Sequence, residues 1–170
     1  MKPTHTFTAF VLLLCAVFFA PLPAEASSKL CSNSAITAFI NRVARKADVR
    51  PPYVLQRRDI SRPQYRVVEN TVETPRCATL NELHHEFGHH VLAMAANGDP
   101  AKFYEFSGQF RQYRVWLKTS QDPEGFERAA HCVGFQLGGR GAYTRCPFKN
   151  ARQLASWMIS AARYFAPYDS

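Results

Sequence analysis

One stretch of five residues, His85-Glu86-Phe87-Gly88-His89, constrains this chain more than any other feature. It lies in a segment with the pattern of an amphipathic helix. Thr79-Leu80-Asn81-Glu82 is a capping box that predicts the start of this helix, and Asn97-Gly98 predicts its end. The two histidines project from the side nearly opposite the apolar stripe, so the helix has a buried face and a separate face for ligands. The apolar stripe consists of Leu80, Leu83, Phe87, Val91 and Met94.

Two histidines four residues apart on one helix face can share a tetrahedral metal ion. Glu86 is offset from them by about 100° on the helix, so it can reach a metal-bound water and accept its proton. This pattern is typical of zinc hydrolases. We therefore expect one Zn²⁺ bound by His85 and His89, with Glu86 as the general base.

A catalytic zinc site usually has three protein ligands. Glu127 and His131 lie four residues apart in a later predicted helix, on the face opposite its apolar residues. Glu127 is the preferred third ligand and His131 is the alternative. In a purely structural interpretation, Glu127 is an exposed acid paired with Arg128 or Lys118.

Other titratable residues lie near the predicted site. Glu105 and Glu124 are remote choices for the third ligand. His84 and His90 flank the ligand face, where we expect them to contact solvent or neighbouring loops rather than metal.

Together the two helices resemble a known family. H-E-F-G-H followed by E-R-A-A-H-C-V-G is similar to the gluzincin branch of the zincin metallopeptidases, in particular to small exported bacterial proteins described as neutral zinc metallopeptidases. The resemblance covers roughly Thr79 to Pro147, and its most specific part is the first helix. It implies that the two motif histidines and Glu127 hold zinc and that Glu86 is the general base.

One position departs from the family pattern. The family's second helix has the sequence E-x-x-A-D, in which Glu is the third zinc ligand and Asp orients a zinc-bound histidine. This chain has His131 in place of that Asp. A neutral imidazole could accept a hydrogen bond from a ligand histidine, or could itself ligate zinc. Without the carboxylate we expect a less basic ligand and lower activity.

The first 26 residues have the pattern of a signal peptide. Lys2 provides a basic start, an apolar region runs from Phe10 to Ala20, and Ala24-Glu25-Ala26 is a small-x-small cleavage site. The apolar run is too short for an ordinary membrane span, and no later segment is long and apolar enough. We expect a soluble protein, secreted or periplasmic, with one zincin-like domain over residues 27–170.

Four cysteines remain after removal of the signal peptide, which contains Cys15. An even number in an exported chain favours two disulfides, and four cysteines allow three pairings. We favour Cys132–Cys146, which closes a short loop, and Cys31–Cys77, which ties the first helix to the segment entering the metal helix. A cysteine zinc site is disfavoured because no pair has C-x-x-C spacing.

The net charge is +8, and cleavage does not change it because the signal peptide carries one Lys and one Glu. Arg57, Arg58, Arg62 and Arg66 concentrate part of this charge. A basic surface can attract anionic wall polymer of the cell envelope, lipid headgroups, acidic peptides or nucleic acid; solubility without a specific partner is an equal alternative. Export argues against a genomic nucleic-acid role.

Hydrophobic periodicity predicts an α+β fold, mostly helical, with a small antiparallel sheet directly before the metal helix. In chain order, the predicted elements are a helix from Ser32 or Asn33 to about Lys46, strands over 53–56 and 65–68, a segment 71–74 that extends the second strand or forms a third, and helices over 79–97, 99–118, 122–138 and 150–165.

The sequence favours hydrolysis of peptide or other amide bonds. The strand segment from Tyr65 to Glu69 could pair with an extended peptide, and Tyr143 is a candidate donor to the oxyanion. Two alternatives remain open. One is a zinc-containing binding module of the cell envelope with little or no catalysis, and the other is a protein in which His85 and His89 are ordinary helix residues.

Overall fold

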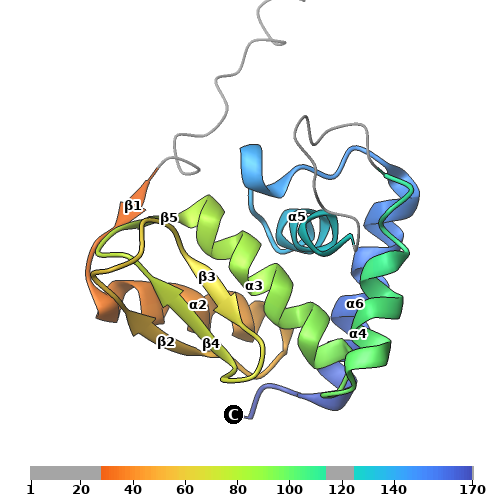
Figure 1. The fold of residues 1–170 in the computed structure, drawn as a ribbon, viewed down its shortest axis with the longest axis horizontal. Coiled ribbons are helices and arrows are strands. Elements are labelled where there is room, and N and C mark those ends of the chain that lie inside the picture. Colours follow the sequence, from red (N-terminus) through yellow and green to blue (C-terminus); the bar gives the residue numbers. More distant parts are fainter. Residues whose placement is uncertain (1–27, 114–124, 170) are drawn as a thin grey trace, which may run out of the picture.

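The computed structural model describes residues 28–113 and 125–169, and the predicted signal peptide lies outside this part (Figure 1). The α+β class with mostly helical content is confirmed. The elements are β1 (Lys29–Leu30), α2 (Asn33–Ala47), β2 (Tyr53–Gln56), β3 (Gln64–Arg66), β4 (Thr71–Thr74), β5 (Ala78–Thr79), α3 (Leu80–Ala95), α4 (Pro100–Gly108), α5 (Phe126–Gln136), the 3-10 helix η3 (Ala142–Thr144) and α6 (Lys149–Phe165).

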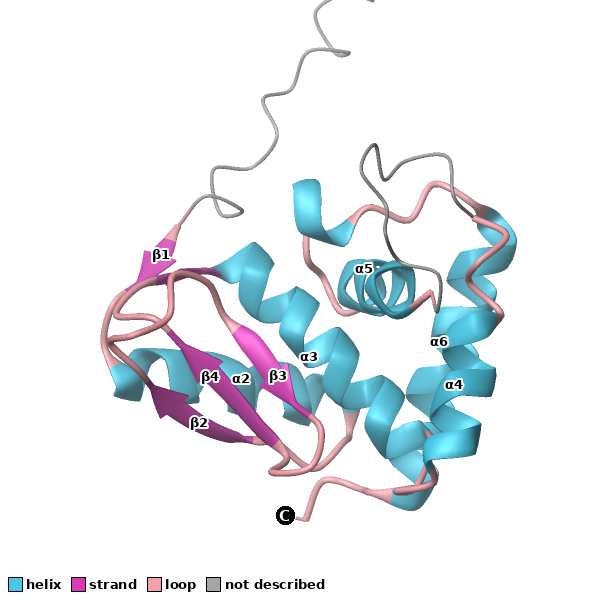
Figure 2. Ribbon diagram, viewed as in Figure 1, coloured by secondary structure: helices cyan, strands magenta, loops and turns pink. Residues whose placement is uncertain are grey.

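The main sheet is mixed rather than antiparallel. Its order is β2-β4-β3, with β2 parallel to β4 and β3 antiparallel to β4 (Figure 2). The prediction of an antiparallel sheet is therefore right for β3 and β4 and wrong for β2 and β4, because the last strand of the three pairs between the first two. A separate antiparallel pair of β1 and β5 lies directly before α3. β3 is shorter than predicted and leaves Val67 and Val68 in the following turn.

Local signals predict the first helix well. Ser32 is its N-cap and accepts a hydrogen bond from the backbone N–H of Ala35, and the helix ends at Ala47 before Asp48, which has a left-handed backbone with φ 56°. Its apolar face packs into the core. Fully buried residues of α3 and α6 join it there, including Leu83, Phe87, Val91, Met158 and Ala162.

Two predicted helix boundaries are wrong. Asp99 caps α4 as expected, but the helix ends at Gly108 rather than near Lys118. α5 begins at Phe126 rather than after Asp122-Pro123, because Gly125 before it has a left-handed backbone with φ 81° that does not continue a helix. Lys118, Asp122, Pro123 and Glu124 lie outside the described residues.

α3 runs through the middle of the fold, with the main sheet and α2 on one side and α4, α5 and α6 on the other (Figure 1). α5 lies directly on α3 at Gly88. A Cβ atom at this position would lie closer to the carbonyl oxygen of Ala130 than van der Waals contact allows. Gly134 makes a similar approach to the carbonyl of His84. Small residues thus bring the two helices that carry the predicted ligands close together.

This close approach makes Gly88→Ala strongly destabilising. The added methyl group must push α5 away from α3, so we expect the free energy of unfolding to fall by about 3 kcal/mol. Chemical denaturation of the metal-free, oxidised protein measures the change. Gly108→Ala is the matched control, because its nearest neighbours are Arg111 side-chain atoms at 3.8 Å, and we expect a change within about 1 kcal/mol. Equal effects of the two substitutions would contradict this account.

Candidate metal centre

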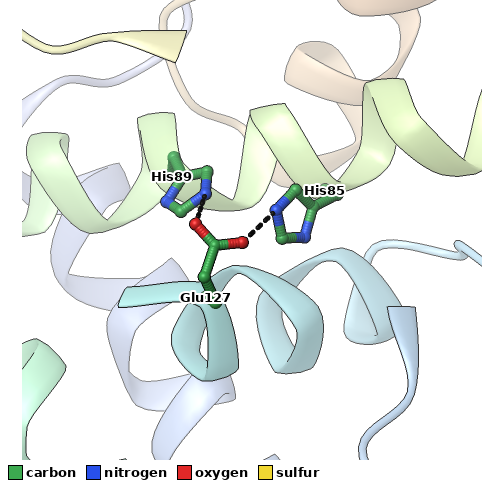
Figure 3. Close-up of side chains that lie close together, drawn as sticks. All are labelled: His85, His89 and Glu127. Carbon is green, nitrogen blue, oxygen red and sulfur yellow. Dashed lines mark hydrogen bonds and ion pairs between the residues drawn. The ribbon is translucent and has the colours of Figure 1, made fainter. Parts of the chain in front are cut away.

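Three side chains converge where α5 begins and α3 passes it (Figure 3). His85 Nε2 lies 3.0 Å from one carboxylate oxygen of Glu127, and His89 Nε2 lies 3.4 Å from the other. One ligand atom from each of the three residues lies within 4.8 Å of the others, so the group could hold a metal ion. The histidines come from successive turns of α3, and Glu127 is the second residue of α5.

The chemistry of these donors fits a metal. Two imidazoles and one carboxylate form a three-ligand set that leaves a fourth coordination position open. Hydrogen bonds from His85 and His89 hold the pKa of the Glu127 carboxyl well below its usual range, so the side chain is ionised and can act as a ligand. The side chain of His85 is 7% exposed and that of Glu127 is 51% exposed, so the group lies at the boundary between the core and an open pocket.

A backbone carbonyl orients the ring of His85. Its Nδ1–H donates to the carbonyl oxygen of Tyr143 at 3.2 Å, so loss of the Nε2 proton that faces Glu127 would leave the Nε2 lone pair for a metal. Tyr143 belongs to η3, and the disulfide between Cys132 and Cys146 ties the segment that follows η3 to α5. A main-chain carbonyl thus fixes the orientation of the first motif histidine.

His131 lies beside this arrangement but not among the converging donors. Its ring is 4.9 Å from the His85 ring and stacks at 6.5 Å on Tyr143. The residue is 4% exposed, and burial lowers its pKa to about 3, so the imidazole is neutral. The structure therefore includes Glu127, and not His131, in the group of side chains that could hold a metal ion. Arg128, the alternative partner of Glu127, is buried on the same helix.

Glu86 is 8% exposed and one of its carboxylate oxygens accepts a hydrogen bond from the backbone N–H of Tyr65 in β3 at 2.8 Å. Burial raises the pKa of the Glu86 carboxyl. A carboxylate with a raised pKa is a better proton acceptor at neutral pH than an ordinary glutamate.

A pocket of about 450 Å³ is lined by the three converging side chains and by Glu86. The edge strand β3 and the turns around it form one wall, and aromatic residues of α4 and α5 form another. Tyr143, the candidate oxyanion donor, also faces the pocket and is 37% exposed. The pocket residues besides His85, Glu86, His89 and Glu127 are Arg62, Pro63, Gln64, Tyr65, Val67, Glu82, Phe103, Phe126 and Tyr143.

The flanking histidines have structural contacts. The Nδ1–H of His84 donates to the carbonyl of Leu80, and its ring packs edge-on against Phe39. His90 is fully buried and its Nε2–H donates to the carbonyl of Arg50 at 2.7 Å. Burial lowers the pKa of each ring to about 4. Of the two expected surroundings, solvent and neighbouring loops, His90 has the second, because the segment between α2 and β2 covers that side of α3.

Both predicted disulfides are present. Cys31 is bonded to Cys77, and Cys132 is bonded to Cys146.

None of the helices in the described part of the chain has the length and apolar character needed to cross a membrane.

Ion pairs within the fold neutralise part of the positive charge of the basic segment from Arg57 to Arg66. Arg57 pairs with Asp59 and Glu73, and Arg66 pairs with Glu73. The hydrogen bond from Arg57 lowers the pKa of Glu73, so this carboxylate is ionised. Arg62 lines the pocket, where it is available to a ligand.

Comparison of the chain with protein-family models, with curated proteins and with solved structures gives no match.

Proposed function

We propose that this protein is an exported zinc metallopeptidase that hydrolyses peptide bonds. In this proposal, Zn²⁺ is held by His85, His89 and Glu127, and Glu86 is the general base. The observation that carries it is the convergence of Glu127, from a second helix, on the two histidines of an H-E-x-x-H motif in an open pocket. The resemblance to gluzincins supports the same assignment of ligands and base.

Zinc bound by these donors would supply Lewis acidity, which polarises a carbonyl group and lowers the pKa of water toward ~7. Glu86 accepts the proton of the attacking water at the carboxylate oxygen that Tyr65 does not hold. As the C–N bond of the substrate breaks, the same carboxyl group delivers this proton to the leaving amine. The hydroxyl of Tyr143 donates a hydrogen bond to the oxygen on which negative charge develops.

The pocket is suited to an extended peptide. β3 lies at the edge of the main sheet, so it can offer main-chain hydrogen bonds to a substrate strand. The Tyr65 amide is occupied by Glu86, and pairing therefore relies on the other edge groups of β3. On the opposite wall, the rings of Phe103 and Phe126 lie 5.0 Å apart and provide an apolar surface for a substrate side chain.

Metal removal provides the test of this function. The oxidised protein, purified without chelator, is expected to contain one zinc per chain and to cleave a library of unfolded fluorogenic peptides. A strong chelator should abolish cleavage because the Lewis acid is lost, and stoichiometric Zn²⁺ should restore it. Elemental analysis and peptide turnover are the measurements. A protein without zinc would support ordinary helix histidines, and a zinc-loaded protein without turnover would support a binding module of the cell envelope.

A further inference from the structure

We infer that Tyr65 is a positioning residue for Glu86. The backbone amide of Tyr65 holds the Glu86 carboxylate, and the side chain of Tyr65 is anchored to the next turn of α3. The inference rests on the proposed function, because it takes Glu86 to be the proton acceptor. It adds a second point of attachment between β3 and α3 that neither the motif nor the family resemblance contains.

The first attachment is the hydrogen bond from the Tyr65 amide to Glu86 Oε2 at 2.8 Å. Tyr65 is the middle residue of β3 and lies opposite Val72 of β4 in the antiparallel register. Its amide is directed at α3 instead of at the neighbouring strand. A charge-assisted bond of this kind stabilises the ionised carboxylate and restricts its rotation, at a side chain that lines the pocket.

The second attachment is made by the Tyr65 side chain. Its hydroxyl lies within hydrogen-bond distance of two acceptors, 3.0 Å from Asn70 Oδ1 and 3.3 Å from Nδ1 of His90. The Tyr65 and His90 rings meet edge-on with their centroids 5.5 Å apart. Because the Nε2–H of His90 donates to the carbonyl of Arg50, its Nδ1 is an acceptor, so the single hydroxyl proton of Tyr65 serves either this nitrogen or Asn70 Oδ1 at one time.

Glu86 and His90 are four residues apart, so they project from the same face of α3. Tyr65 contacts both and therefore spans one turn of this helix. Displacement of β3 along or away from α3 would break both contacts together. The position of the general base thus depends on a part-buried hydroxyl group, which contacts Asn70 and His90 and none of the proposed metal ligands.

Amide hydrogen exchange of the metal-free protein tests the first attachment without any assay of activity. Glu86→Ala removes the acceptor, so exchange at the Tyr65 amide should become about tenfold faster while core amides such as that of Leu92 keep their rates. Tyr65→Phe should accelerate exchange at residue 65 by a smaller factor. An unchanged exchange rate at Tyr65 in Glu86→Ala would overturn the inference.

The catalytic consequence is measured on the zinc-loaded protein. Tyr65→Phe should lower kcat about fivefold and leave KM and zinc affinity within about twofold, because only the base is displaced. Tyr168→Phe is the matched control and should leave all three values unchanged. Equal losses of zinc affinity and kcat, or an unaltered kcat, would overturn the positioning role. A wild-type protein that cleaves no peptide would instead refute the proposed function, and the exchange result would still decide the attachment.

Discussion

Glu86→Gln is expected to reduce kcat for peptide cleavage about 1,000-fold while leaving zinc affinity nearly unchanged. The amide has the size and shape of the carboxylate, and its oxygen can still accept the hydrogen bond from the Tyr65 backbone. It cannot accept a proton from water at neutral pH. Turnover of a fluorogenic peptide by zinc-loaded protein measures the loss, and elemental analysis measures the metal.

Glu105→Gln is the control for this experiment, since it makes the same chemical change on the exposed surface of α4. We expect its kcat and KM to equal those of the wild type. Undiminished turnover by Glu86→Gln would eliminate Glu86 as general base. Loss of zinc together with turnover would show that the substitution acts on the metal group rather than on the proton transfer.

Glu127→Ala is expected to weaken zinc binding at least about 100-fold, because it removes an ionised donor and leaves only two imidazoles. His131→Ala should weaken binding by about tenfold or less, since its ring packs on His85 and is not one of the three converging groups. Competition with a chromophoric chelator measures both affinities in the oxidised protein.

The two substitutions also separate the rival assignments of the third ligand. A larger loss in His131→Ala than in Glu127→Ala would make His131 the ligand and would contradict the arrangement of Figure 3. A zinc-bound structure gives the same answer directly, because zinc ligands lie about 2.0–2.2 Å from the metal when the donor is nitrogen or oxygen.

Local sequence signals predict the part of the centre that lies on α3. The capping box of Thr79 and Glu82 forms as expected, and the helix then places His85 and His89 one turn apart. The Asp99 cap and the apolar face of α2 are equally local. Each of these features depends on residues within a few positions of one another, so periodicity and capping residues are sufficient to predict them.

Local sequence signals do not predict features that depend on contacts between residues far apart in the chain. The parallel pairing of β2 with β4 follows from which strand occupies the centre of the sheet, and no short pattern encodes that choice. Asp122-Pro123 has the local pattern of a helix start, but α5 begins after Gly125, whose packing against Ser107 is a long-range contact. The Tyr143 carbonyl and the Tyr65 amide are main-chain atoms, which every residue type carries, so composition and spacing could not single them out.

The disulfide between Cys132 and Cys146 has a consequence for the order in which this protein matures. It closes the stretch of chain that contains Tyr143, whose carbonyl receives the Nδ1–H of His85. With free thiols, this covalent tie is lost, and the Tyr143 carbonyl is held only by the noncovalent contacts of η3, such as the hydrogen bond from Thr144 to Asn81. We therefore expect thiol oxidation to come before tight metal loading, so that the nascent reduced chain competes poorly for zinc and acquires its ion only where its cysteines have been oxidised.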